Sequence, residues 1–327
     1  MKFKTTAIAM AVAGTVAAPV AVQAGADELY ASARIGVWDV NQFDDNTVDV
    51  RSFSSRFGAK GETDLGNGLT GFGRYEWDVD FNNDIGEDDI SVRHRYVGLK
   101  GDFGSVLLGQ TYHTFYNFVV GPNDNPWWHS GYEMVNYRGR TDDGVTYAGS
   151  AGEFNFGATV YMTSGNSVGD SSTTLNAGSD NIDQWEVGAS MGIGDLTLGV
   201  AAQGTADDNI QGGYGSDDII GGVALSGLTL GTVNLGFGAQ MQKDDWSALV
   251  DAGIGNAYVH IEYLAVDKDS AASTNGEDQD KVSYTLGYTQ TLGRKTTMYY
   301  ELNYIDRDAK GSDDRTAAMA VLKYDII

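Results

Sequence analysis

Two sets of charged side chains recur at every second or fourth residue, and they are Arg56, Lys60 and Glu62, followed by Arg74, Glu76 and Asp78. Residues two apart lie on the same face of a β-strand, so each set would project charges of both signs from one face. Aromatic neighbours such as Phe57 and Trp77 would occupy the opposite face. Such a charged face attracts and selects ions and polar solutes, and it does not by itself make or break bonds.

The residues needed for most bond-making chemistry are sparse. The chain has no cysteine, which excludes thiol nucleophiles, thiolate metal sites and disulfides. It has no phosphate-binding loop, no nucleophile elbow and no His-x-x-x-His spacing among its four histidines, which are His94, His113, His129 and His260. We expect His113 and His129 to be hydrated loop side chains. The sequence predicts neither an enzyme nor a bound metal or cofactor.

Period-two alternation of apolar and polar residues, as in 282–289 and 297–304, predicts β-strands throughout the chain. We count sixteen such segments, near 28–40, 50–63, 68–80, 90–101, 103–111, 138–149, 153–163, 183–193, 195–204, 217–227, 228–242, 245–254, 256–267, 280–292, 295–306 and 315–327. Most hold about 9–13 residues, which suits a tilted strand that crosses a bilayer. Short turns, one of them predicted at Ser226–Gly227, mostly alternate with long connections, of which 112–137 is the longest.

Acidic residues outnumber basic ones, 45 to 21, and crowd the long connections. The net charge of −24 argues against nucleic-acid binding, which requires a basic face. Two Asp-x-Asp pairs, Asp267 with Asp269 and Asp306 with Asp308, could offer oxygens to Ca²⁺. The twelve-residue calcium-loop pattern is missing, so we expect solvated acids. Their bias to every second connection predicts two ends in different surroundings.

The first residues have the pattern of a secretory signal peptide. Lys2 and Lys4 precede an apolar stretch over 5–18, and small residues lead to Ala24. We therefore expect residues 1–24 to be a signal peptide and residues 25–327 to form the mature domain. An exported chain without disulfides needs another source of stability, such as a closed hydrogen-bond network.

A closed transmembrane β-barrel satisfies these observations together. In lipid every backbone polar group must be paired within the protein, and closure removes the unpaired sheet edges. Sixteen strands leave a lumen too wide for side chains to fill, so water enters. A charge aimed at the bilayer midplane costs about 2–4 kcal/mol. We therefore expect Arg56 and Arg74 to point into the lumen.

Three stretches, 54–77, 95–110 and 140–147, resemble in order and spacing the general diffusion porins of Gram-negative bacteria. The resemblance implies an all-β fold, a 16-stranded antiparallel transmembrane barrel with its third external loop, here about 112–137, folded inward. It also implies a homotrimer in the outer membrane, among lipid and lipopolysaccharide, that lets ions and small hydrophilic solutes diffuse through a water-filled channel.

The same resemblance assigns a pore constriction. Arg56, Arg93 and Arg140 match the family's wall arginines by motif and Arg34 matches by strand face, while the alternating pattern adds Arg74. The inward loop offers Asp124 and Glu133 as opposing acids, although it lacks the usual Pro-Glu-Phe-Gly-Gly motif. The chain also ends on Ile326 and Ile327 where the family has a terminal Phe, and we expect one of them to replace it.

The first five strands present small outward residues, Ala31, Ala33, Ala59 and Gly71, and we expect His94 to point outward beside them. This wall is predicted to be the subunit interface. Alternatives remain a substrate-selective porin, an outer-membrane barrel enzyme, an adhesin or uptake barrel, and a soluble β-sandwich. An enzyme would need a catalytic constellation, and an uptake barrel would need an N-terminal plug. A β-sandwich would need a core in which to bury its aromatic rows.

Overall fold

A computed structural model describes residues 27–42, 45–80, 90–129, 139–162, 182, 184–205, 219–269, 279–308 and 314–327. The predicted signal peptide lies outside these residues. The strands are β1 (Glu28–Gln42), β2 (Asp45–Ser52), β3 (Ser55–Gly66), β4 (Leu69–Val79), β5 (Ile90–Gly101), β6 (Gly104–Tyr112), β7 (Arg140–Ala151), β8 (Phe154–Tyr161), β9 (Gln184–Ile193), β10 (Leu196–Thr205), β11 (Ile220–Leu230), β12 (Val233–Gln242), β13 (Asp245–Ile254), β14 (Ala257–Val266), β15 (Gln279–Gly293), β16 (Thr296–Asp308) and β17 (Arg315–Asp325). Two short helical turns are η1 (Tyr116–Val120) and η2 (Gly121–Asn123).

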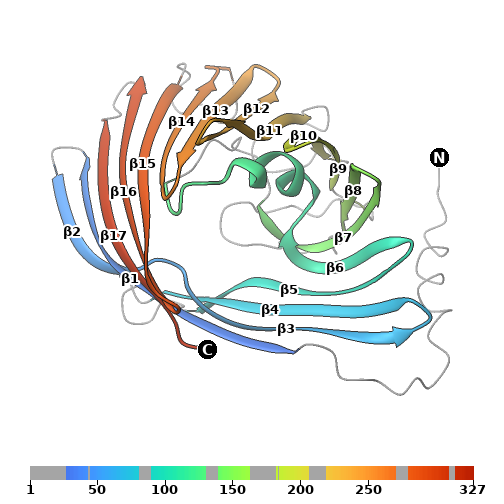
Figure 1. Ribbon diagram of the computed structural model, residues 1–327. Helices are drawn as coiled ribbons and strands as arrows, with labels where there is room; N and C mark the ends of the chain where they lie inside the picture. Colours follow the sequence, from blue (N-terminus) through green and yellow to red (C-terminus); the bar gives the residue numbers. More distant parts are fainter. Residues whose placement is uncertain are drawn as a thin grey trace.

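The strands form one antiparallel sheet that closes into a barrel (Figure 1). Consecutive strands pair around the ring, and β17 pairs with β1 over Ser32–Asn41. β2 and β3 both pair with β1, so together they count as one barrel strand, which is interrupted at Phe53 and Ser54. The predicted 16-stranded antiparallel barrel is therefore confirmed.

One predicted turn is wrong. Ser226 and Gly227 lie within β11, which continues to Leu230, and the hairpin turn follows at Gly231. The pairing of β11 with β12 shifts register between Leu225 and Leu228, which is a β-bulge. Gly227 has φ 79°, and an added Cβ there would lie 2.0 Å from the Asp195 carbonyl oxygen. Glycine permits the bulge, so it imitates a turn signal in the sequence.

The two faces of the barrel differ as the alternation predicts. Large apolar and aromatic residues are exposed on the outside, including Tyr284, Tyr304, Tyr288 and Tyr300, whose rings adjoin in pairs across β15 and β16. The intervening residues on these strands, such as Ser283 and Asn303, are buried and polar. Among the described residues, no helix has the length and apolar character needed to span a membrane.

The connection after β6 enters the barrel. Residues 113–129 of this connection are called the inner segment, and Figure 1 shows its two helical turns inside the ring. η1 contacts β9, β10 and β11, and η2 contacts β11 and β12. Phe115, Val119 and Val120 of this segment form a buried apolar cluster with residues of the wall, which are Ala201, Ile220, Leu249, Leu264 and Val266.

Candidate functional site

Five arginines from strands in one part of the barrel wall, β1 to β7, gather on the inner face around one carboxylate. They are Arg34 on β1, Arg56 on β3, Arg74 on β4, Arg93 on β5 and Arg140 on β7. The fully buried Glu76 accepts from Arg74 Nη2 at 2.5 Å and Arg93 Nε at 2.9 Å, and lies 3.7 Å from Arg56 Nη1. Arg93 interacts electrostatically with both Arg34 and Arg140. The structure thus brings together all five arginines that the sequence singled out.

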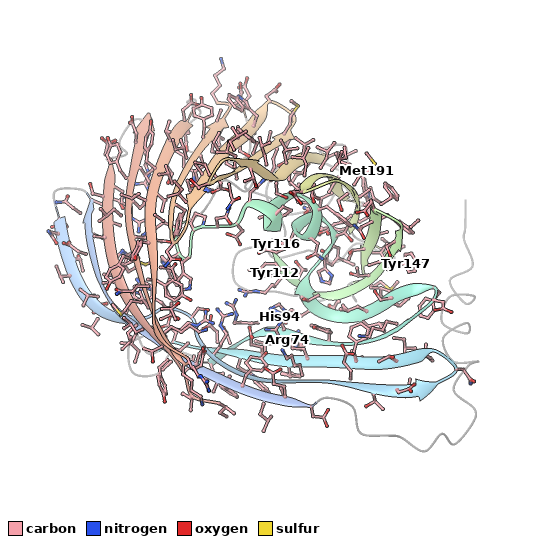
Figure 2. The ribbon with its side chains drawn as sticks, viewed as in Figure 1. Arg74, His94, Tyr112, Tyr116, Tyr147 and Met191 are labelled. Carbon is pink, nitrogen blue, oxygen red and sulfur yellow. The ribbon has the colours of Figure 1, made fainter. Side chains whose placement is uncertain are left out.

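A β-bulge lets Arg93 join this cluster. The pairing of β4 with β5 shifts register between Glu76 and Trp77, so no residue of β4 is paired with Arg93 in the ladder. His94 then stands opposite Glu76 and also faces inward, where its Nδ1 lies 3.0 Å from Thr111 Oγ1. The expectation that His94 points outward was wrong, because strict alternation does not hold across a bulge. Figure 2 shows Arg74 and His94 on the inside of the wall.

Ser54 ties the arginines together, and sequence reasoning did not identify it. It lies between β2 and β3 with φ 59°. Its Oγ accepts from Arg93 Nη1 at 2.9 Å and from Arg56 Nη2 at 3.2 Å, and it donates to Asp78 at 2.9 Å. The interruption between β2 and β3 therefore places the Ser54 hydroxyl within hydrogen-bond distance of two guanidinium groups.

The inner segment is held at its start by Glu186 of β9. The Glu186 carboxylate accepts from the Phe115 amide at 2.7 Å and from the Tyr161 hydroxyl at 2.5 Å. Beside it, the Thr114 and Thr159 hydroxyls lie 2.9 Å apart. A carboxylate at the first amides of a helical turn satisfies donors that have no partner within the turn.

The far end of the segment is held by Glu301 of β16. Its carboxylate accepts hydrogen bonds from the consecutive amides of Trp127, Trp128 and His129, and from the Tyr258 hydroxyl. His129 Nδ1 adds a contact of 2.9 Å to Glu301 Oε2. This single buried carboxylate therefore satisfies several donors of a chain segment more than 170 residues away in sequence.

Aromatic packing supports the same end. The ring of Trp127 stacks on Tyr299 at 4.4 Å, and Trp128 packs edge-on against Phe53 at 5.0 Å. Trp38 lies beside Phe53, and the guanidinium of Arg51 lies 4.0 Å above the Trp38 ring. These contacts join the inner segment to β16 and to the strands that carry Arg34 and Arg56.

Glycines on the inner wall make room between these anchors. An added Cβ at Gly199 of β10 would lie 2.0 Å from the Phe118 carbonyl oxygen. One at Gly222 of β11 would lie 2.6 Å from Val119 Cγ1. The segment therefore lies directly on backbone, a role that these glycines do not reveal in the sequence alone.

His113 and His129 are buried, contrary to the expectation of hydrated loop residues. His113 Nδ1 lies 2.8 Å from Thr146 Oγ1, and its Nε2 lies 2.8 Å from the Thr141 carbonyl oxygen. Burial lowers the pKa of His113 to about 4, so the side chain is neutral at neutral pH. Both histidines fasten the inner segment to the wall.

Of the two predicted acids, Asp124 lies on the inner segment and Glu133 lies outside the described residues. Asp124 accepts from the Tyr116 hydroxyl at 2.9 Å. Tyr116 stacks on Tyr112 at 3.7 Å, and Arg140 lies 5.2 Å over the Tyr112 ring. This row links Asp124 to the arginine cluster, and Figure 2 shows both tyrosines within the barrel.

The comparisons agree with this architecture. A family model described as Gram-negative porin matches residues 5–310. The chain belongs to the Gram-negative porin family. Within the described part of this porin, no group of three or more acidic or histidine side chains is placed to hold a metal ion.

Its relatives are similar over part of their length. Outer membrane protein YedS of Escherichia coli is 31% identical over 122 residues, covering 35% of this chain and 33% of that protein. Outer membrane porin PhoE of Enterobacter cloacae is 40% identical over 77 residues, 23% of this chain and 21% of that protein. The matches thus span a third or less of these curated relatives. A structure of OmpF from Salmonella typhi in complex with daunomycin shares the fold, with TM-score 0.72, 16% identity, and coverage of 92% of this chain and 98% of that one.

Proposed function

We propose that this porin forms a water-filled channel through the outer membrane, through which ions and small hydrophilic solutes diffuse passively. The observation that carries the proposal is a closed barrel whose inner wall holds five arginines, while the inner segment is fastened to other parts of that wall. Charges kept on the inner face are well hydrated only if water fills the lumen. Family and fold do not favour a barrel enzyme.

The narrowest part of the pore lies, in this proposal, between the inner segment and the wall that carries Arg34, Arg56, Arg74, Arg93 and Arg140. Asp124 and Glu133 would be the acids of the opposite side. The link from Asp124 through Tyr116 and Tyr112 to Arg140 supports this assignment for Asp124.

The proposal also covers processing, topology and assembly. Residues 1–24 would be removed as a signal peptide, and residues 25–327 would form the barrel. The tight turns would face the periplasm and the long connections the outside, and the outer apolar face would contact lipid and lipopolysaccharide. Three copies would assemble through the wall with small outward residues such as Ala33 and Ala59.

Single-channel recording from the purified protein in planar bilayers tests the proposal. We expect ohmic currents in KCl that persist at constant voltage, and entry of small neutral sugars into loaded liposomes. Three conductance steps of equal size per insertion event would support a trimer. A protein that inserts and leaves the bilayer sealed to ions would overturn the channel function.

A further inference from the structure

A pocket of about 540 Å³ opens on the inner wall at the end of the barrel where β1 begins and β17 ends. The tight turn between β15 and β16 closes its rim. Seven of its lining residues are basic and three are acidic. The arginine cluster contributes three of the basic residues, and the other four are Lys60, Arg294, Lys295 and Lys323.

The three acids of the pocket are already engaged. Glu28 lies 3.0 Å from Lys60 Nζ, Asp325 lies 3.0 Å from Lys323 Nζ, and Glu76 is shared among the arginines. In the described part of the chain, no carboxylate lies within 4.0 Å of the charged groups of Arg294 or Lys295. Lys295 Nζ donates instead to the Ile326 carbonyl oxygen at 3.3 Å. The pocket therefore keeps an excess of positive charge.

This excess is unexpected in such an acidic protein. The chain has a net charge of −24 and 21 basic residues, of which seven line this one pocket. Like charges in a hollow with low-dielectric walls repel each other, and they concentrate anions from the solution. The ends of the strands that lead to the long connections instead carry acids, including Asp80, Asp280 and Asp314.

We propose that this pocket binds small polyanions, molecules with two or more phosphate or carboxylate groups, as they enter the pore from the turn side. Guanidinium groups pair with such oxygens through two parallel hydrogen bonds, and lysines add point charges. The volume lies within the range of small-molecule sites. Arg34 and Arg74 on the wall would bind one anionic group. Arg294 and Lys295 on the rim would bind the other.

This inference rests on the proposed channel, because it assigns a class of solute to one mouth of it. The pocket should bind polyanions more readily from the turn side, because polyanions that approach from the long-connection side first meet the acids there. Binding should weaken as salt rises, because the exposed rim charges are screened within about 8–10 Å at physiological ionic strength.

Single-channel current in KCl is to be recorded while inorganic pyrophosphate is added to one side and then to the other. The turn side is identified with Asp102→Cys in the β5–β6 turn and a polymer-linked maleimide too large for the pore. We expect pyrophosphate to reduce the current at concentrations at least tenfold lower from the turn side, which corresponds to about 1.4 kcal/mol. Equal potency from both sides would overturn the proposal.

The variant Arg294→Gln/Lys295→Gln should remove this sided block and leave the KCl conductance close to that of the parent. Lys100→Gln is the matched control, because Lys100 lies outside the pocket and pairs with Glu62 at 2.7 Å. An unchanged block in the double variant would refute the site. Calorimetry with pyrophosphate and the detergent-solubilised protein measures binding without conduction. Binding lost in the double variant would support the pocket even if the channel proposal failed, and binding kept there would refute it.

Discussion

Replacing Glu301 by Gln should release the far end of the inner segment. Glu301 is 1% exposed and accepts hydrogen bonds from three consecutive amides through its two oxygens. Gln keeps one acceptor oxygen, and it directs an NH2 group at donors where the carboxylate had its second oxygen. At least two hydrogen bonds are then lost, and the charge that strengthened the others is gone.

The magnitude follows from the strength of such bonds. Hydrogen bonds to a charged group contribute about 1.5–3 kcal/mol each, so two of them amount to roughly 3–6 kcal/mol. Since about 1.4 kcal/mol is a factor of ten, protection of the 127–129 amides against hydrogen exchange should fall by roughly 10²–10⁴. Single-channel currents should become noisier as the released segment moves in the lumen.

The matched control is Glu62→Gln, another inner-wall glutamate, which is exposed and pairs with Lys100 rather than with the inner segment. It should leave the exchange of these amides unchanged. If Glu301→Gln keeps both the parental protection at 127–129 and the parental current, the carboxylate does not hold the segment and the reasoning fails.

Three further predictions concern selectivity, pH and topology. Arg56→Gln/Arg93→Gln should shift the reversal potential in a KCl gradient towards cations, because the Glu76 carboxylate remains in the cluster; an unchanged potential would place these arginines away from the narrow part. Burial lowers the pKa of His113 from 6.5 to about 4, so stability is full above pH 6.5 and is lost as pH falls towards 4, by up to about 3 kcal/mol; thermal unfolding of the parent and of His113→Gln should diverge in that window, and parallel pH profiles would contradict it. In intact cells an impermeant maleimide too large for the pore should label Asp269→Cys and spare Asp102→Cys, and the reverse pattern would invert the barrel.

The sequence alone determined the barrel and the orientation of most of its charges. Side chains on a strand alternate with period two, so apolar rows such as Tyr284, Leu286 and Tyr288 and their polar neighbours could be assigned to opposite faces. Closure followed because a sheet in lipid cannot leave an edge unpaired. The inward direction of Arg56 and Arg74 followed because the opposite choice would put a charge in lipid.

Only the tertiary structure decided how these pieces meet. The bulge that turns both Arg93 and His94 inward depends on the register between β4 and β5, and register is set by pairing partners rather than by local residues. Glu186 and Glu301 hold amides 71 and 172 or more residues away, and no local pattern distinguishes them from other inner-wall acids. The basic pocket arises because closure brings the two ends of the chain's sheet, β1 and β17, side by side. Local periodicity fixes which face a residue occupies, whereas the contacts across the lumen exist only once the barrel has closed.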